Sequence, residues 1–185
     1  GGLERVAEII AELNIDLIWF QETDPLSVNE IKTILSNHEG YNQLYSTPSE
    51  SNISILSKFP IIETYDYDLY GIGADVLINV TDTIKFVSSH LTAYPYGPYD
   101  LYEGISIEDV LNNEMTTRYI ENLDIYNQII SNPSNNPNLP VIYVGDHNTP
   151  SHLDWGYNNI NQNFGYEVMW PVSEFLIDNN FYDSY

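Results

Sequence analysis

The sequence has no cysteine and few basic residues, and both absences limit its chemistry. With no Cys among 185 residues, disulfides and thiolate metal sites are excluded, so a metal ion would need Asp, Glu, Asn or His as ligands. Five Lys and Arg residues stand against 27 Asp and Glu, for a net charge of −22. This charge repels phosphate backbones and anionic membranes and attracts divalent cations. A long nucleic acid is therefore disfavoured as a partner but stays open, as does an acidic surface kept simply for solubility or a salty habitat.

Long apolar runs are also missing. No run approaches the roughly 20 residues that a membrane span requires. The first residues, GGLERVAEIIAEL, lack the basic start and apolar middle of a secretory signal. We expect a soluble chain without a membrane span. Its location stays open, and if the protein is secreted, its signal peptide is expected upstream of this sequence.

Apolar residues are nevertheless plentiful, at 43% with 14% aromatics, which is enough for the core of one domain over residues 1–185. Their spacing alternates between the periods of helices and strands. Helices are predicted over residues 3–13, 28–35, 108–131 and 171–180; strands over 16–20, 52–61 and 141–144; a hairpin over 74–91; and a loop over 131–140. The pattern predicts an α/β fold with mixed sheets, because a hairpin interrupts the alternation.

Three predicted strands end in polar residues. Glu22 follows DLIWFQ, His90 follows IKFVSS, and Asp146 with Asn148 follows VIYVG. Ligand sites in open α/β sheets lie at strand ends. Each residue alone is typical of a solvated loop, but together they indicate a site for a metal ion and a phosphate group.

Four segments carry a family resemblance: RVAEIIAELNIDLIWFQET, SNISILSKFPI, FVSSHL and VIYVGDHNTPSHLDW. In order and spacing they resemble the endonuclease/exonuclease/phosphatase family of metal-dependent phosphoesterases. The Gln-Glu pair and the Gly-Asp-x-Asn motif are specific when they occur together. The resemblance implies a four-layered α/β sandwich, here partial, and hydrolysis of a phosphoric ester with Mg²⁺, or with Mn²⁺ or Ca²⁺.

The resemblance also implies roles for four residues. Glu22 matches the principal ligand of the divalent ion. His90 matches a histidine that contacts the scissile phosphate. Asp146 matches the residue that orients or deprotonates the attacking water and contributes to the metal site, and Asn148 matches a neutral donor to the phosphoryl oxygens.

Other residues of these segments have weaker assignments. His147, at the variable position of the motif, is expected to support the site from below. His152 is a candidate pocket residue, although Ser151 and Asp154 have the spacing of a helix cap, so a helix start or a turn fits equally well. We expect the Tyr-rich segment after His90 to be a loop at the mouth of the site, where Tyr94 and Tyr96 either line the pocket or pack within the loop.

Family members also begin with a strand that ends in a metal-binding Asn and finish with an Asp-His pair. Neither is present, so we expect a fragment of a longer protein, an incomplete catalytic domain over residues 1–185 that is itself weakly active or inactive. A small or lipid-like phosphodiester is the preferred substrate, with a nuclease as the alternative. A scaffold that lacks catalysis and a simple Ca²⁺ module are weaker alternatives. The four polar residues argue against the scaffold, and the missing Asp-rich calcium loop argues against the module.

Overall fold

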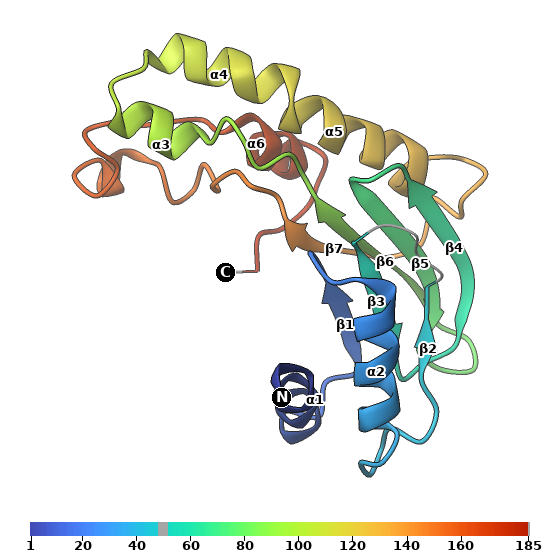
Figure 1. Ribbon diagram of the computed structural model, residues 1–185. Helices are drawn as coiled ribbons and strands as arrows, with labels where there is room; N and C mark the ends of the chain where they lie inside the picture. The colour runs from blue at the N-terminus through green and yellow to red at the C-terminus, as the bar shows by residue number, and fades with distance from the viewer. Residues whose placement is uncertain (48–51, 185) are drawn as a thin grey trace. The chain divides into compact units, whose positions relative to one another are not determined.

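The computed structural model describes residues 1–47 and 52–184 (Figure 1). The chain separates into two compact units, which are described one at a time. The first contains residues 1–90 and 125–146, and the second contains residues 91–124 and 147–185. The expectation of a single catalytic domain over the whole chain stays a prediction. Within the described residues, no helix is both long and apolar enough to cross a membrane.

The first unit opens with two helices over a small antiparallel sheet. The helices are α1 (Gly2–Glu12) and α2 (Pro25–Leu35). The sheet has the order β1-β3-β2 and contains β1 (Leu17–Phe20), β2 (Tyr45–Ser46) and β3 (Ser54–Ser57). Asp24 begins α2, because its carboxylate accepts hydrogen bonds from the N–H groups of Leu26 and Ser27, at 2.9 and 3.1 Å.

The apolar stripes of both helices face this sheet. A buried cluster joins the two helices to β1 and β3, and its members include Ala7, Ile10, Ile18, Phe20, Val28, Ile31, Leu35 and Leu56. In α1 and α2 these residues recur at the three- and four-residue spacing that places side chains on one helical face. Helices in both predicted regions, and the strands next to them, are confirmed.

The second sheet has the order β4-β5-β6-β7: β4 (Ile61–Tyr67), β5 (Gly71–Leu77), β6 (Thr83–His90) and β7 (Val141–Asp146). The first three strands pair antiparallel, whereas β6 and β7 are parallel. The predicted hairpin of β5 and β6 and the mixed sheet are therefore confirmed. The strand β4 was missed, because its polar residues interrupt any long apolar run.

The two sheets pack face to face, and a helix covers the far side. Ile53, Ile55, Ile72, Ala74, Val76 and Phe86 form the core between the sheets. On the opposite face, the π-helix η1 (Tyr126–Ile130) lies close to β5. A Cβ on Gly71 would come within 2.8 Å of Ile125, and one on Gly73 within 2.6 Å of Ile129. Helices, sheet, sheet and helix make the four layers that the family resemblance implied.

A buried ion pair lies on this outer face of the second sheet. Lys85 Nζ is 2.7 Å from the Asp75 carboxylate, and both side chains are fully buried. Tyr65 and Asn136 each donate a hydrogen bond of 2.8 Å to the same carboxylate. Burial, with the nearby Asp75 charge, raises the pKa of Tyr65 well above its ordinary value, so this hydroxyl keeps its proton and remains a donor.

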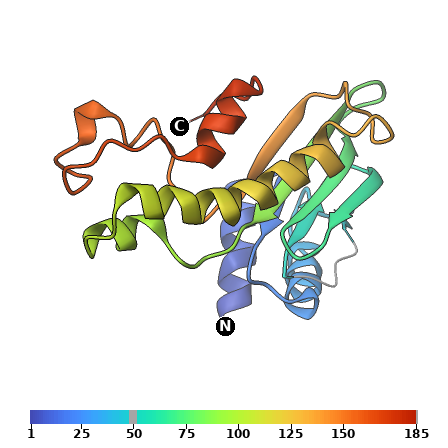
Figure 2. The same cartoon turned by 90° about the horizontal axis from the view of Figure 1, so that it is seen from above.

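The second unit is mainly helical (Figures 1 and 2). Its helices are α3 (Gly97–Tyr102), α4 (Ile107–Thr116), α5 (Arg118–Ile125), the 3₁₀ turn η2 (Tyr157–Asn159) and α6 (Pro171–Asp178). The last residue of α5 belongs to the first unit. The core of the second unit is formed by Leu101, Val110, Trp155, Val168 and Trp170.

Two expectations for this region were wrong. Residues 108–131 do not form one helix, because the chain breaks at Thr117, where φ is −123° and ψ is −98°. At this break, the hydroxyls of Thr116 and Thr117 donate hydrogen bonds to carbonyls of the preceding turn, including that of Asn113. The segment after His90 is not entirely a loop either, because it contains the short helix α3. Pro98 lies in the first turn of this helix, where proline is favoured.

The ion pair gives a stability prediction. Lys85→Met removes the cation and leaves the buried Asp75 carboxylate without its counter-charge, so the free energy of unfolding should fall by about 3–5 kcal/mol in urea titrations. The matched control is Lys32→Met, since the Lys32 ammonium has a long 3.4 Å contact with Ser46, and its effect should stay within about 0.5 kcal/mol. Equal losses in both variants would show that the buried pair is not a special determinant of stability.

Candidate active site

Two neighbouring strands of the second sheet end together. In the parallel register of β6 and β7, His90 is paired with Asp146 and Ser89 with Gly145. A Cβ at position 145 would lie 2.1 Å from the Ser89 carbonyl oxygen, and the φ of Gly145 is +142°, which side chains rarely allow. The glycine of the Gly-Asp-x-Asn motif is thus required for the close strand pairing that places Asp146 beside His90.

Glu22 reaches the same edge from the first sheet. It follows β1 in a left-handed backbone conformation, with a φ of +53°, and its side chain is 77% exposed. The Oε1 atom of Glu22 lies 3.7 Å from Nε2 of His90, whose side chain is 14% exposed. The Thr23 hydroxyl holds the turn by donating a 2.9 Å hydrogen bond to the Gln21 carbonyl. The strand ends of both sheets therefore meet at one edge of the first unit.

Gln21 links the two sheets directly below this edge. Its amide Nε2 donates a 3.0 Å hydrogen bond to Oγ of Ser88, a fully buried residue of β6. The Gln-Glu pair predicted a role for Glu22 but none for Gln21. The available signal was a polar side chain at the end of an apolar strand, where a buried partner is required.

The edge offers donors for a hard cation but not a complete cage. Glu22 and Asp146 are exposed carboxylates, the ligand type that Mg²⁺ and Mn²⁺ prefer. Across the described part of the chain, no group of three or more His, Asp or Glu side chains is arranged to hold a metal ion. The donor set fits a cation such as Mg²⁺ that keeps several of its waters and binds through one or two carboxylates.

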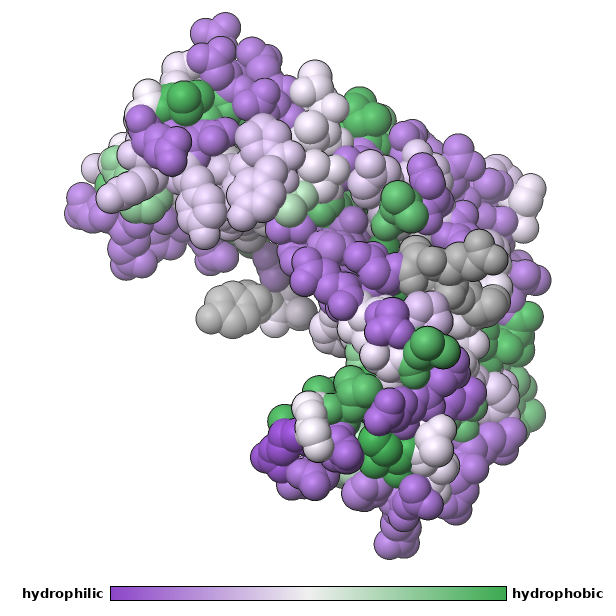
Figure 3. Space-filling model, in the orientation of Figure 1, coloured by the Kyte–Doolittle hydropathy of each residue, from purple (hydrophilic) through white to green (hydrophobic). Residues whose placement is uncertain are grey.

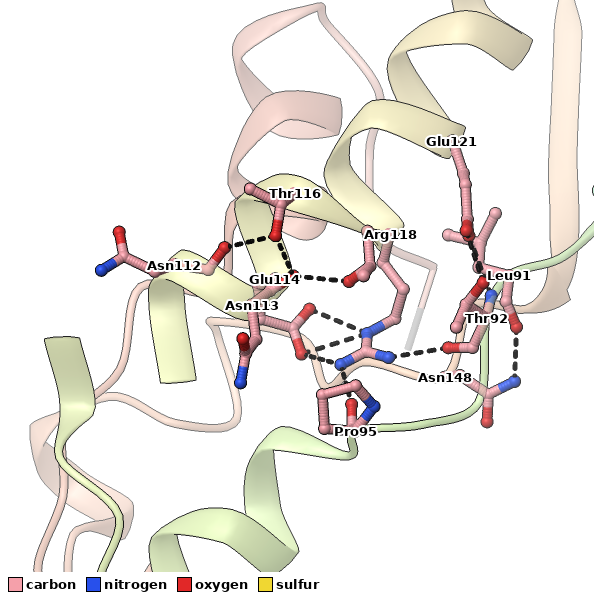
Figure 4. A network of polar contacts seen from close by, with 11 residues as sticks. Leu91, Thr92, Pro95, Asn112, Asn113, Glu114, Thr116, Arg118, Glu121 and Asn148 are labelled. Atoms are coloured by element: carbon pink, nitrogen blue, oxygen red, sulfur yellow. Dashed lines mark hydrogen bonds and ion pairs between the residues drawn. The ribbon is translucent and has the colours of Figure 1, made fainter. Parts of the chain in front are cut away.

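Asn148 belongs to the second unit. It has a φ of +49°, and its Nδ2 donates a 2.9 Å hydrogen bond to the carbonyl of Leu91, the residue after His90 (Figure 4). The amide of Asn148 thus fixes the first residue of the segment that leaves β6.

Helices α4 and α5 anchor the rest of that segment (Figure 4). The guanidinium of Arg118 donates to the carbonyls of Thr92, at 2.7 Å, and Pro95, and it pairs with the carboxylate of Glu114. Both charged side chains are fully buried. Glu121 accepts a 2.8 Å hydrogen bond from the backbone N–H of Thr92. Residues 92–95 are therefore held by a buried cation and its neighbouring carboxylates.

The weaker candidates also lie in the second unit. His147 is half-buried, and Tyr94 is 72% exposed. Tyr96 packs edge-on against Tyr99, with ring centroids 4.9 Å apart. The Nδ1 atom of His152 lies 2.8 Å from Oγ of Ser173, a residue of α6. His152 itself lies within a turn and not at a helix start. Roles for these residues in a substrate pocket stay predictions.

Gln21 can be tested as a positioning residue. Gln21→Ala removes the partner of the buried Ser88 hydroxyl, so it should reduce the free energy of unfolding by about 1–3 kcal/mol in chemical denaturation. Gln43→Ala is the control, because Gln43 is exposed, and it should be nearly neutral. A neutral Gln21→Ala would mean that water replaces the amide without loss.

Gly145 gives a second prediction. Gly145→Ala forces β7 away from Ser89 and should cost about 3 kcal/mol of stability, measured by thermal or urea unfolding. Gly156→Ala should have little effect, because its added Cβ would meet nothing closer than the Leu153 carbonyl oxygen at 3.8 Å. An unchanged stability for Gly145→Ala would contradict the close pairing of β6 and β7.

No family model matches the chain. It is 22% identical over 203 aligned residues to the uncharacterized protein F14F9.5 of Caenorhabditis elegans, and it spans 60% of that protein's length. Among solved structures, it is similar to D. rerio TDP2 complexed with single strand DNA product, at 13% identity over 89% of this chain and 58% of that one, with a TM-score of 0.49. It is also similar to truncated C. elegans TDP2, at 17% identity over 80% and 55% of the two chains, with a TM-score of 0.47. Likenesses of this size assign neither a family nor an activity.

Proposed function

We propose that the chain forms part of the active site of a metal-dependent phosphoric ester hydrolase. The observation that carries the proposal is the meeting of three ionisable side chains at one edge of the first unit. Glu22 lies 3.7 Å from His90, and His90 is the register neighbour of Asp146. Two carboxylates and an imidazole suit phosphoester hydrolysis, which depends mainly on positioning and on stabilising charge.

Each side chain has a role that follows from its chemistry. Glu22 and Asp146 would hold a divalent cation such as Mg²⁺ or Mn²⁺, which supplies Lewis-acid polarisation of the phosphoryl group when bound. Asp146 also orients the attacking water and accepts its proton. His90 donates a hydrogen bond to a phosphoryl oxygen, and its low exposure of 14% limits competition from water.

The distribution of cations supports a small or lipid-like phosphodiester as the substrate. Lys85 and Arg118 are fully buried in ion pairs. Lys58 is 3.1 Å from Asp16, and Arg5 is 3.0 Å from Glu8. Three of the five cations therefore have little exposed surface, since the Lys58 side chain is only 12% exposed, whereas Arg5 remains 60% exposed. A groove for duplex DNA needs several cations free to contact phosphates.

The role of Glu22 gives a direct test in the whole protein that carries this chain. Glu22→Gln should reduce the Mg²⁺-dependent hydrolysis of bis(p-nitrophenyl) phosphate by about a hundredfold or more, because a neutral amide is a poor ligand for a hard cation. Glu30→Gln, an exposed substitution on α2, is the control and should keep full activity. Normal turnover and metal titration in Glu22→Gln would remove Glu22 from the site.

The same assay separates the water-activating group from a supporting one. Asp146→Asn should lose far more turnover than His147→Ala, since the neighbouring histidine is assigned no contact with the reacting atoms. Equal losses in two folded variants would contradict this division. Efficient cleavage of duplex DNA that falls steeply with added salt would instead favour the nuclease alternative.

A further inference from the structure

A row of aromatic rings lies on the second unit. It runs along α3 through Tyr96, Tyr99 and Tyr102 to Phe164, and these four residues are called the aromatic ledge. Tyr96 and Tyr99 pack edge-on with centroids 4.9 Å apart, and Tyr102 and Phe164 are 5.3 Å apart. Tyr99 and Tyr102 are three residues apart on one helix, so they share a face.

The ledge is exposed but rests on a rigid base. Tyr99, Tyr102 and Phe164 are 60%, 72% and 52% exposed. Phe164 also contacts Trp155, at 6.4 Å between centroids, and Trp155 packs edge-on against the fully buried Trp170. The rings therefore project from a packed aromatic core and do not belong to a loose segment.

The backbone at Phe164 is unusual. Its φ is +57°, a left-handed conformation that bulky residues rarely adopt, and Gly165 follows with a φ of +90°. A large apolar side chain is thus held half in solvent by a backbone geometry that it disfavours. Such outliers concentrate at binding and catalytic sites.

The charge around the ledge has one sign. The second unit contains twelve Asp and Glu residues and a single Arg or Lys, Arg118, which is fully buried against Glu114. Asp100 and Glu103 alternate with the ledge tyrosines along α3. In the described part of this unit, no basic Lys or Arg side chain remains at the surface to neutralise them. Figure 3 shows pale and strongly hydrophilic side chains mixed over α3 and no continuous apolar patch.

We propose that the aromatic ledge is a docking surface for a Lys- and Arg-rich peptide segment of a protein partner. Aromatic faces attract cations through their quadrupoles, and neighbouring carboxylates add a charge attraction of the same sense. A nucleic acid would also find rings on which to stack, but the acidic side chains repel its phosphates, and within the described residues of the second unit no exposed Lys or Arg compensates. The combination of rings and carboxylates therefore selects a basic peptide.

The test is calorimetric titration with three probes, which reads binding and is independent of hydrolysis. The first probe is an acetylated, amidated peptide of alternating Lys and Ser; the second replaces each Lys by Glu; and the third is a single-stranded oligothymidine of similar length. We expect the Lys peptide to bind, more weakly as salt is added, and the other two to give no heat. Failure of the Lys peptide to bind, or stronger binding of the oligothymidine, would overturn the proposal.

Substitutions then locate the site. The double variant Tyr99→Ser with Tyr102→Ser should weaken binding of the Lys peptide by roughly tenfold, whereas Tyr102→Phe, which keeps the ring, should bind as the parent does. Tyr182→Ser is the matched control, because Tyr182 is 93% exposed and is not part of the ledge. Equal affinity in the double variant and the control would show attraction by overall charge alone, and would overturn the assignment to the ledge.

Discussion

The close pairing of β6 with its neighbours determines the geometry of the candidate site. Three consecutive residues at the end of β6 each meet a different part of the edge. The Ser88 hydroxyl accepts a hydrogen bond from Gln21, the Ser89 main chain leaves room for no side chain at Gly145, and His90 lies 3.7 Å from Glu22. A shift of β6 by one residue would break all three contacts at once, because each side chain of the strand would then point to the opposite face of the sheet.

Two of the five basic side chains are fully buried, and this limits what the surface can bind. Lys85 stabilises the outer face of the second sheet, and Arg118 fixes the segment after His90. Each is fully buried with a carboxylate, so neither is available to a phosphate. The remaining surface favours metal ions and basic groups over polyanions. The proposed substrate and the proposed peptide partner therefore follow from the same distribution of charge.

Much of the fold follows from local patterns. The helical spacing in α1 and α2 and the alternation in β5 and β6 identified those elements, because each buries one regular apolar face. The break at Thr117 and the helix α3 could not be read this way. A hydrogen bond from the Thr117 hydroxyl to the backbone accompanies the break. The packing of Leu101 into the core of the second unit stabilises α3.

The candidate site was predictable to a smaller extent. The sequence indicated polar residues at strand ends, but the contact between Glu22 and His90 joins residues from different sheets, and no local pattern encodes such a distance. The role of Gln21 depends on Ser88, which lies 67 residues away in the sequence. The buried position of Arg118 was also hidden, because a basic residue in an amphipathic helix is usually exposed.

Gly71 and Gly73 of β5 set the distance between the second sheet and η1. Ile125 and Ile129 occupy the space that a side chain at either glycine would need. Volume at this boundary is shared between two segments that are more than fifty residues apart in the chain. A larger residue at Gly73 is compatible with the same packing only if Ile129 becomes smaller. We therefore expect these positions to covary among homologous sequences.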